Sequence, residues 1–150
     1  MLRWFTPAIL VIGIVASLYG CSVFKPNLTA AQAAYLDKAS AAPLQFTVSE
    51  KELPQAWQRA RNFVEKHGAL RIVRSDERDI ATEPPAPDGL EVGYEIHNTP
   101  AAGGNVRIVV NAISNARGYG SNAATRANRS AHILAYYIRT GELDASLLDQ

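Results

Sequence analysis

The sequence contains very little cysteine, methionine and net charge, and these shortages exclude several classes of protein. Its 150 residues include one Cys and one Met, and 15 Lys and Arg against 14 Asp and Glu leave a formal charge of +1. A single Cys excludes an intramolecular disulfide framework, a Cys-rich zinc site and a CxxC redox pair. Because no basic excess is present to neutralise phosphates, we expect no nucleic-acid partner. An apolar content of 47% is ordinary for a globular chain and predicts one domain with a normal core.

The N-terminal region lacks an apolar run long enough to cross a bilayer in a helix. Residues 8–18 form an apolar run, broken by no charge, that is only 11 residues long, whereas a spanning helix needs about 20. Arg3 precedes this stretch, as a positive charge does in secretory signals, and the stretch matches the apolar centre of such a signal. Residues 1–20 are therefore expected to be a signal peptide.

The four residues Leu18, Tyr19, Gly20 and Cys21 resemble the lipobox of bacterial lipoproteins. Leu stands three residues before the Cys and a small residue stands directly before it, although Tyr19 departs from the small residue usual at the middle position. The resemblance implies cleavage before Cys21 and acylation of that residue. Several acyl chains hold a protein persistently, because each buried methylene contributes about 0.8 kcal/mol. The alternative is an uncleaved N-terminal anchor helix in a thin bilayer.

The residue after the Cys bears on the membrane in which the protein is anchored. In the sorting rule of enterobacterial lipoproteins an Asp there retains the protein in the inner membrane, and this chain has Ser22. The resemblance thus implies the periplasmic face of the outer membrane, with the periplasmic face of the inner membrane as the alternative.

Residues 21–43 are rich in Ala and lack a sustained apolar face, which predicts a lipidated tether with part of 29–41 helical. The folded periplasmic domain is expected over residues 44–150.

Apolar periodicity in residues 44–150 predicts an α+β domain. Alternation with period two indicates strands near 44–48, 69–74, 79–82, 90–97 and 106–113. Helical spacing indicates helices near 53–67 and 122–139, the first preceded by a capping box of Ser49 and Glu52 and ended by Gly68. Short links between the later strands favour antiparallel pairing. We expect two layers, with a mainly antiparallel sheet of four to five strands covered by two helices, in the order β-α-β-β-β-β-α.

Patterns that would carry catalysis or hold a metal are weak in this sequence. The three His residues have no second ligand at a recognised metal spacing, and Glu95 with His97 on one strand face makes only a pair. Residues 118–123 match G-x-G-x-x-A, but no strand follows the helix they would open, so a capped loop is favoured over a dinucleotide site. Glu91 and Glu95 are explained more simply by cross-strand pairs with Arg107 or Arg71 than by acid–base hydrolysis. We expect no catalytic residues, no metal and no cofactor.

A basic and aromatic flank on the C-terminal helix is the best candidate for a binding surface. It comprises Arg117, Tyr119, Arg126, Arg129, His132, Tyr136 and Arg139. Such a flank suits an anionic glycan, a lipid headgroup or an acidic protein surface. The alternative is a solvated helix face along which the arginines lie. A second hypothesis places a small-ligand pocket between the sheet and this helix, near Tyr94, Tyr119 and Tyr136.

The order of predicted elements over 44–140 is similar to that of the small α+β domains of BamC-type lipoproteins, which accompany outer-membrane protein assembly. This likeness rests on element order and on no motif. Together with the lipobox it implies a non-enzymatic accessory or structural module, whose partner is an envelope protein or an anionic glycan or lipid. The alternatives are a lipid- or glycan-binding module that uses the pocket beside the C-terminal helix, and an enzyme.

Overall fold

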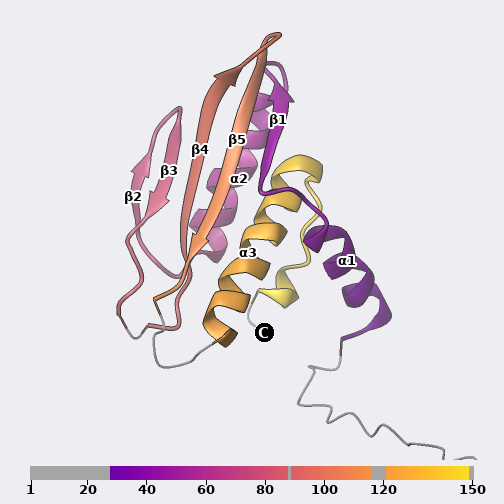
Figure 1. Cartoon of the computed structure of the whole chain (residues 1–150), viewed down its shortest axis with the longest axis vertical. Helices are drawn as coiled ribbons and strands as arrows, with labels where there is room; N and C mark the ends of the chain where they lie inside the picture. Colours follow the sequence, from indigo (N-terminus) through magenta and orange to yellow (C-terminus); the bar gives the residue numbers. More distant parts are fainter. Residues whose placement is uncertain (1–27, 88, 116–120, 149–150) are drawn as a thin grey trace, which may run out of the picture.

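Five strands form one antiparallel sheet, and helices cover one of its faces (Figure 1). The computed structural model describes residues 28–87, 89–115 and 121–148. The strands are β1 (Gln45–Ser49), β2 (Ile72–Ser75), β3 (Asp79–Thr82), β4 (Gly93–Ala101) and β5 (Asn105–Ile113). They lie in the order β1-β5-β4-β3-β2, so β1 is placed beside the last strand of the chain. The expected α+β fold with an antiparallel sheet is confirmed.

Two long helices pack on the same face of this sheet. They are α2 (Leu53–His67) and α3 (Ser121–Thr140), and a shorter helix, α1 (Ala30–Ser40), lies against α3 (Figure 1). A 3-10 turn, η1 (Ala145–Leu147), returns the chain toward α1 and buries Leu147. Within the described ranges, no helix combines the length and the apolar content that a bilayer span requires.

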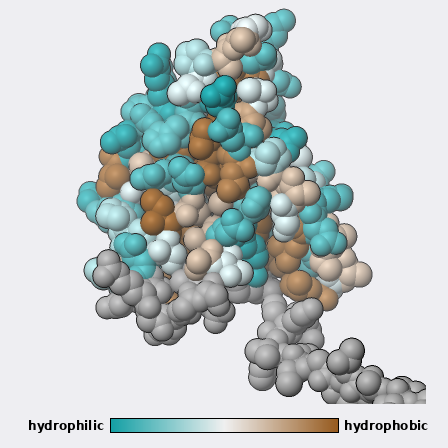
Figure 2. All heavy atoms as spheres, viewed as in Figure 1, coloured by the Kyte–Doolittle hydropathy of each residue, from teal (hydrophilic) through white to brown (hydrophobic). Residues whose placement is uncertain are grey.

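The core lies between the sheet and the two long helices. Its most deeply buried side chains include Phe63, Val64, Ile80, Ile96, Ile108, Val110, Leu134 and Ile138. Alternate residues of the strands point to the opposite face, which is mostly polar, with Asp79, Glu95, His97, Thr99, Arg107 and Asn111. Among the described residues no helix or strand covers that face (Figure 1). In the view of Figure 2, hydrophobic residues form small separate patches between hydrophilic ones.

Proline sets the start of α2. The capping-box residues do bond each other, because the Ser49 amide donates to Glu52 Oε2 at 3.0 Å and the Glu52 amide to Ser49 Oγ at 3.3 Å. These bonds form in the turn before the helix, which begins at Leu53 with Pro54 in its first turn. Proline is tolerated there because the first amides of a helix have no intrahelical acceptor.

A helix was expected within residues 29–41 and is observed as α1, but it also packs against α3, so residues 28–43 are not simply a tether. Thr29 caps α1 by a capping box with Gln32, and the ring of Tyr35 meets that of Tyr136 edge-on at 5.5 Å. Ala39 in α1 and Ala42 after it are both buried. Alanines give no wide apolar stripe, so helical periodicity is faint in the sequence, yet their small size lets α1 approach α3 closely.

Candidate binding site

An open groove lies between the first turns of α2 and the end of the sheet at which β2 turns into β3. We call it the Trp57 groove; its volume is about 590 Å³, and its lining comprises Glu50, Leu53, Pro54, Trp57, Glu77, Arg78, Asn98, Pro100 and Val106. The side chains of Trp57 and Val106 are buried and form an apolar floor, whereas Glu50, Glu77 and Arg78 are exposed at the rim. The groove thus combines an apolar floor with a charged rim.

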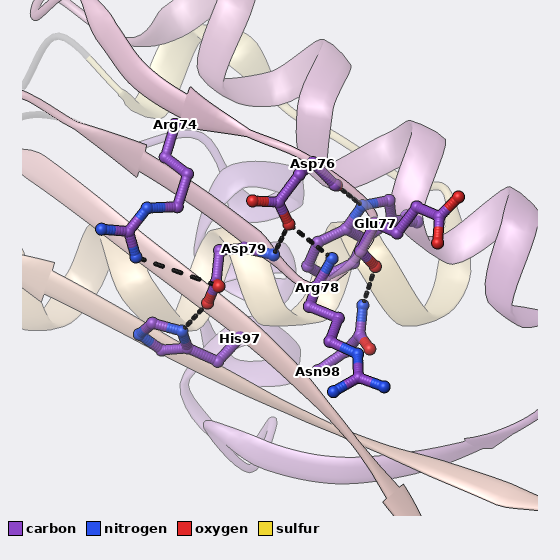
Figure 3. A network of polar contacts seen from close by, with 8 residues as sticks. Arg74, Asp76, Glu77, Arg78, Asp79, His97 and Asn98 are labelled. Atoms are coloured by element: carbon purple, nitrogen blue, oxygen red, sulfur yellow. Dashed lines mark hydrogen bonds and ion pairs between the residues drawn. The ribbon is translucent and has the colours of Figure 1, made fainter.

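One wall of the groove is the turn between β2 and β3, and Asp76 holds it in shape (Figure 3). The Asp76 carboxylate accepts the backbone amides of Arg78 and Asp79, each at 2.8 Å. Its own amide donates to the Asp79 carbonyl at 2.9 Å. This is the local bonding for which Asp is favoured in turns. The hydrogen bonds from the Arg78 and Asp79 amides lower the pKa of the Asp76 carboxyl.

Side chains from α2 and β4 fasten this turn to the rest of the domain. Trp57 Nε1 donates to the Asp76 carbonyl at 2.9 Å. From β4, Asn98 Nδ2 donates to the Glu77 carbonyl at 2.6 Å, and the Asn98 amide donates to the Arg78 carbonyl at 2.9 Å. Asn98 is 7% exposed, and burial makes such bonds costly to break. The groove is therefore preformed, because hydrogen bonds join its three walls.

We expect the turn to weaken in acid through Asp76. Because folding lowers the pKa of this carboxyl, the interaction stabilises the fold fully at pH values above the pKa of this carboxyl in the unfolded chain. That stabilisation is lost as the pH falls through the lower, folded value. Asp76→Asn keeps an acceptor oxygen but does not titrate in this range. Urea unfolding between pH 5 and 2.5 should show a shallower loss of stability for Asp76→Asn than for wild type, and parallel curves would contradict this account.

Asp79 also organises the other face of the sheet, away from the helices. Its carboxylate bonds His97 Nδ1, and Arg74 Nη1 lies 3.9 Å from its second oxygen (Figure 3). The partner of His97 is therefore Asp79 rather than Glu95. In the part of the chain that the structure describes, no three His, Cys, Asp or Glu side chains gather as metal ligands.

The cross-strand pairs expected for Glu91 and Glu95 do not form among the described residues, and Glu91 lies before β4 with no strand partner. Glu95 lies opposite Asn111, and Arg107 lies opposite Thr99. The remaining arginine of the expected pairs, Arg71, forms its ion pair with Glu83 instead. Strand register decides which side chains meet, and it cannot be read from the separate strands.

The middle of the expected basic and aromatic flank packs inside the domain. His132 Nδ1 donates to the Ala42 carbonyl at 2.8 Å. The Tyr136 hydroxyl donates to Glu142 Oε2 at 2.8 Å, and its ring contacts Tyr35 of α1. Helix α1 and the segment after it therefore occupy the part of the flank that was expected to face a partner or solvent.

The arginines of the flank are separated along α3. Arg126 Nη1 donates to the Leu90 carbonyl at 3.4 Å, whereas Arg139, near the other end of the helix, lies over the Phe46 ring at 5.7 Å from its centroid. Arg129 is half-buried, and burial together with the charge of Arg126 lowers the pKa of its guanidinium. Arg117 and Tyr119 lie outside the described residues. The described members of the flank do not form one continuous surface.

Tyr94 and Tyr136, expected to share a pocket, lie on different sides of α3. Tyr94 is 4% exposed, meets Phe63 edge-on at 5.7 Å and hydrogen-bonds Ser130. Burial raises the pKa of its hydroxyl. A cavity of about 230 Å³ does adjoin Tyr94 and Ser130, and the end of α2, the segment before β4 and Leu148 also line it. Tyr136 belongs to the contact with α1 instead, so the expected pocket is not formed around both tyrosines.

The helical periodicity of residues 53–67 gives no indication of the groove beside Trp57. Helical periodicity does not predict which group accepts the indole N–H of Trp57. It also does not predict that the β2–β3 turn lies beside this residue. The one local signal is Asp76, three residues before the returning strand, a position typical of a turn that bonds its own backbone.

Comparison of the chain with models of protein families, with curated proteins and with solved structures found no match.

Proposed function

We propose that this chain is an envelope lipoprotein, anchored by acyl chains on Cys21 at the periplasmic face of the outer membrane. Its domain is a non-enzymatic accessory module that binds another envelope protein. The observation that carries the binding part of this proposal is the preformed Trp57 groove. An apolar floor within a polar rim is the usual anatomy of a protein-binding surface.

The short link to the proposed anchor supports work close to the membrane. Leu28, the first described residue, is seven residues along the chain from Cys21. Even a fully extended link of that length reaches only about 25 Å. An acylated Cys21 would therefore hold α1 near the lipid surface and limit the partner to components of, or next to, the same membrane.

The rim of the groove supports a protein partner over a small molecule. Glu50, Glu77 and Arg78 make no ion pair within the described part of the chain, so their charges are available to a partner. Three charged side chains around an apolar floor suit an apolar anchor residue with charged neighbours, as a protein segment supplies.

Photo-crosslinking of the full chain in the living cell tests this proposal. A photoreactive residue in place of Pro100, which is exposed on the groove, is expected to give one predominant protein adduct. The same residue in place of Glu65, exposed on α2 away from the groove, serves as the matched control. Charge reversal by Arg78→Glu should reduce the Pro100 adduct several-fold. Equal labelling from both positions would refute a groove-directed partner, and adducts with lipid alone at Pro100 would mean that the groove binds lipid rather than a protein.

A further inference from the structure

The outer edge of β1 has backbone groups that no described residue hydrogen-bonds. The Val110 amide donates to the Leu44 carbonyl, and the Glu50 amide to the Gly104 carbonyl, so alternate residues of this segment bond β5. By the same alternation Gln45, Thr47 and Ser49 direct their amides and carbonyls away from the sheet. The Ser49 amide donates to the Glu52 carboxylate, and the Ser49 carbonyl accepts the Glu52 amide. The open part of the edge therefore consists of Gln45 and Thr47.

The two edges of the sheet differ in their protection. Exposed edges in natural proteins are usually blunted by charged residues, proline or irregular pairing. The β2 edge follows this rule, because its register shifts between Ile72 and Arg74 and arginines lie in and before it. The β1 edge does not, since its sequence has neither charge nor proline and its register with β5 runs without a shift.

A basic cavity adjoins the open edge on the side of the helices. Its volume is about 280 Å³, and Thr47 and Val48 of β1 line it together with Arg59 of α2 and Arg139 of α3. Arg59 Nη1 donates to the carbonyls of Ile138 and Arg139, at 3.1 and 3.4 Å, and this fixes its guanidinium at the end of α3. Neither arginine pairs with a carboxylate in the described ranges.

The one carboxylate of this cavity does not neutralise the arginines. Glu52 lines the same space, but its carboxylate accepts the amide and, at 2.7 Å, the hydroxyl of Ser49. The bonds from the Ser49 hydroxyl and amide also lower the pKa of Glu52. The cavity therefore has two guanidinium groups, those of Arg59 and Arg139, and one carboxylate, which is already bonded to Ser49. This excess of positive charge suits a carboxylate supplied by a partner.

We propose that β1 accepts an extended segment of a partner protein by strand addition, and that an acidic side chain of this segment enters the cavity at Arg139. Gln45 and Thr47 offer the segment two amides and two carbonyls. The residue opposite Phe46 then points to the helix side of the sheet, because directly opposed residues share a face. Arg139 already lies over the Phe46 ring and meets that side chain. This inference rests on the proposed protein-binding function and adds a second contact surface to it.

A second copy of this chain fits the edge less well than an acidic partner. The β1 sequence contains no acidic residue, so self-pairing supplies no carboxylate to the cavity. A two-fold axis through paired β1 strands also brings the Arg139 side chains of both copies toward the same seam, and like charges there oppose association.

Peptide binding to the full chain in detergent micelles tests the inference by fluorescence anisotropy. The probes are two labelled nine-residue peptides of alternating Thr and Val, one with Glu and one with Lys at the centre of the Val face. We expect the Glu peptide to bind at least about tenfold more tightly. Arg139→Glu should invert this preference, and Arg74→Glu, on the opposite edge, should leave it unchanged. Equal affinities of the two peptides for wild type, or no response to Arg139→Glu, would overturn the proposal.

A backbone variant tests strand addition itself. Thr47→Pro removes an outward amide without removing a bond to β5, a position at which an edge strand tolerates proline. This variant should bind the Glu peptide at least about tenfold more weakly than wild type does. Unchanged binding by the folded variant would overturn strand addition. If this variant does not fold, the charge inversion at Arg139 still decides. A wild-type dimer that Thr47→Pro dissociates would identify a second copy as the occupant instead.

The outcome separates this inference from the proposed function. A protein adduct at Pro100, together with equal affinities of the two peptides, would support the groove function and refute strand addition alone. Conversely, selective binding of the Glu peptide without an adduct at Pro100 would support the β1 site and refute the groove.

Discussion

Replacing Cys21 by Ala is expected to abolish processing and acylation of the chain completely. The acyl chains are attached through the thiol of this residue in the lipoproteins that its sequence resembles, and no other Cys is available. Intact mass of the membrane-extracted protein should equal residues 21–150 plus acyl chains for wild type. For Cys21→Ala it should equal the uncleaved chain.

Ser22→Asp is the matched control for this experiment. It leaves the thiol in place, so the mass should match that of acylated wild type, while the sorting rule predicts a shift to the inner membrane on fractionation. A wild-type mass corresponding to all 150 residues would instead mean an uncleaved N-terminal anchor. The outer-membrane assignment would then be withdrawn, whereas the groove and the β1 edge would be unaffected.

Phe63→Ala is expected to cost about 3–5 kcal/mol of the free energy of unfolding. Phe63 is 1% exposed, and its ring lies 5.7 Å from that of Tyr94 and 6.1 Å from that of Tyr137. Removing it therefore empties a space shared by α2, the sheet and α3. Because domains of this size are stable by about 5–15 kcal/mol, urea unfolding of the chain from Ser22 onward should show a large fall in midpoint.

Two variants bracket this prediction. Phe63→Leu fills most of the space and should cost clearly less, so it remains measurable even if the Ala variant does not fold. Val73→Ala, at a position 55% exposed, should change stability by no more than about 0.5 kcal/mol. If Phe63→Ala and Val73→Ala had similar effects, the packing described around Phe63 would be wrong.

The sequence by itself determined the elements and their order over most of the domain. Alternation located β3 (Asp79–Thr82) at its observed bounds and β5 (Asn105–Ile113) to within a residue. Pro54 and Gly68 bracket α2 at residues with local physical reasons to begin and end a helix. These features depend on side chains close together in the chain, so a single segment contains the information.

Only the tertiary structure decided what the side chains contact. An alanine-rich segment with no clear apolar stripe became α1, and its docking turned Tyr136 and His132 from an expected binding flank into internal packing. The bond from Trp57 to the Asp76 carbonyl, and the choice of Asp79 rather than Glu95 by His97, depend on strand register and helix placement. Such contacts join residues that are distant in sequence, and they stabilise the fold only after the intervening chain has brought these residues together. Local periodicity therefore cannot specify them.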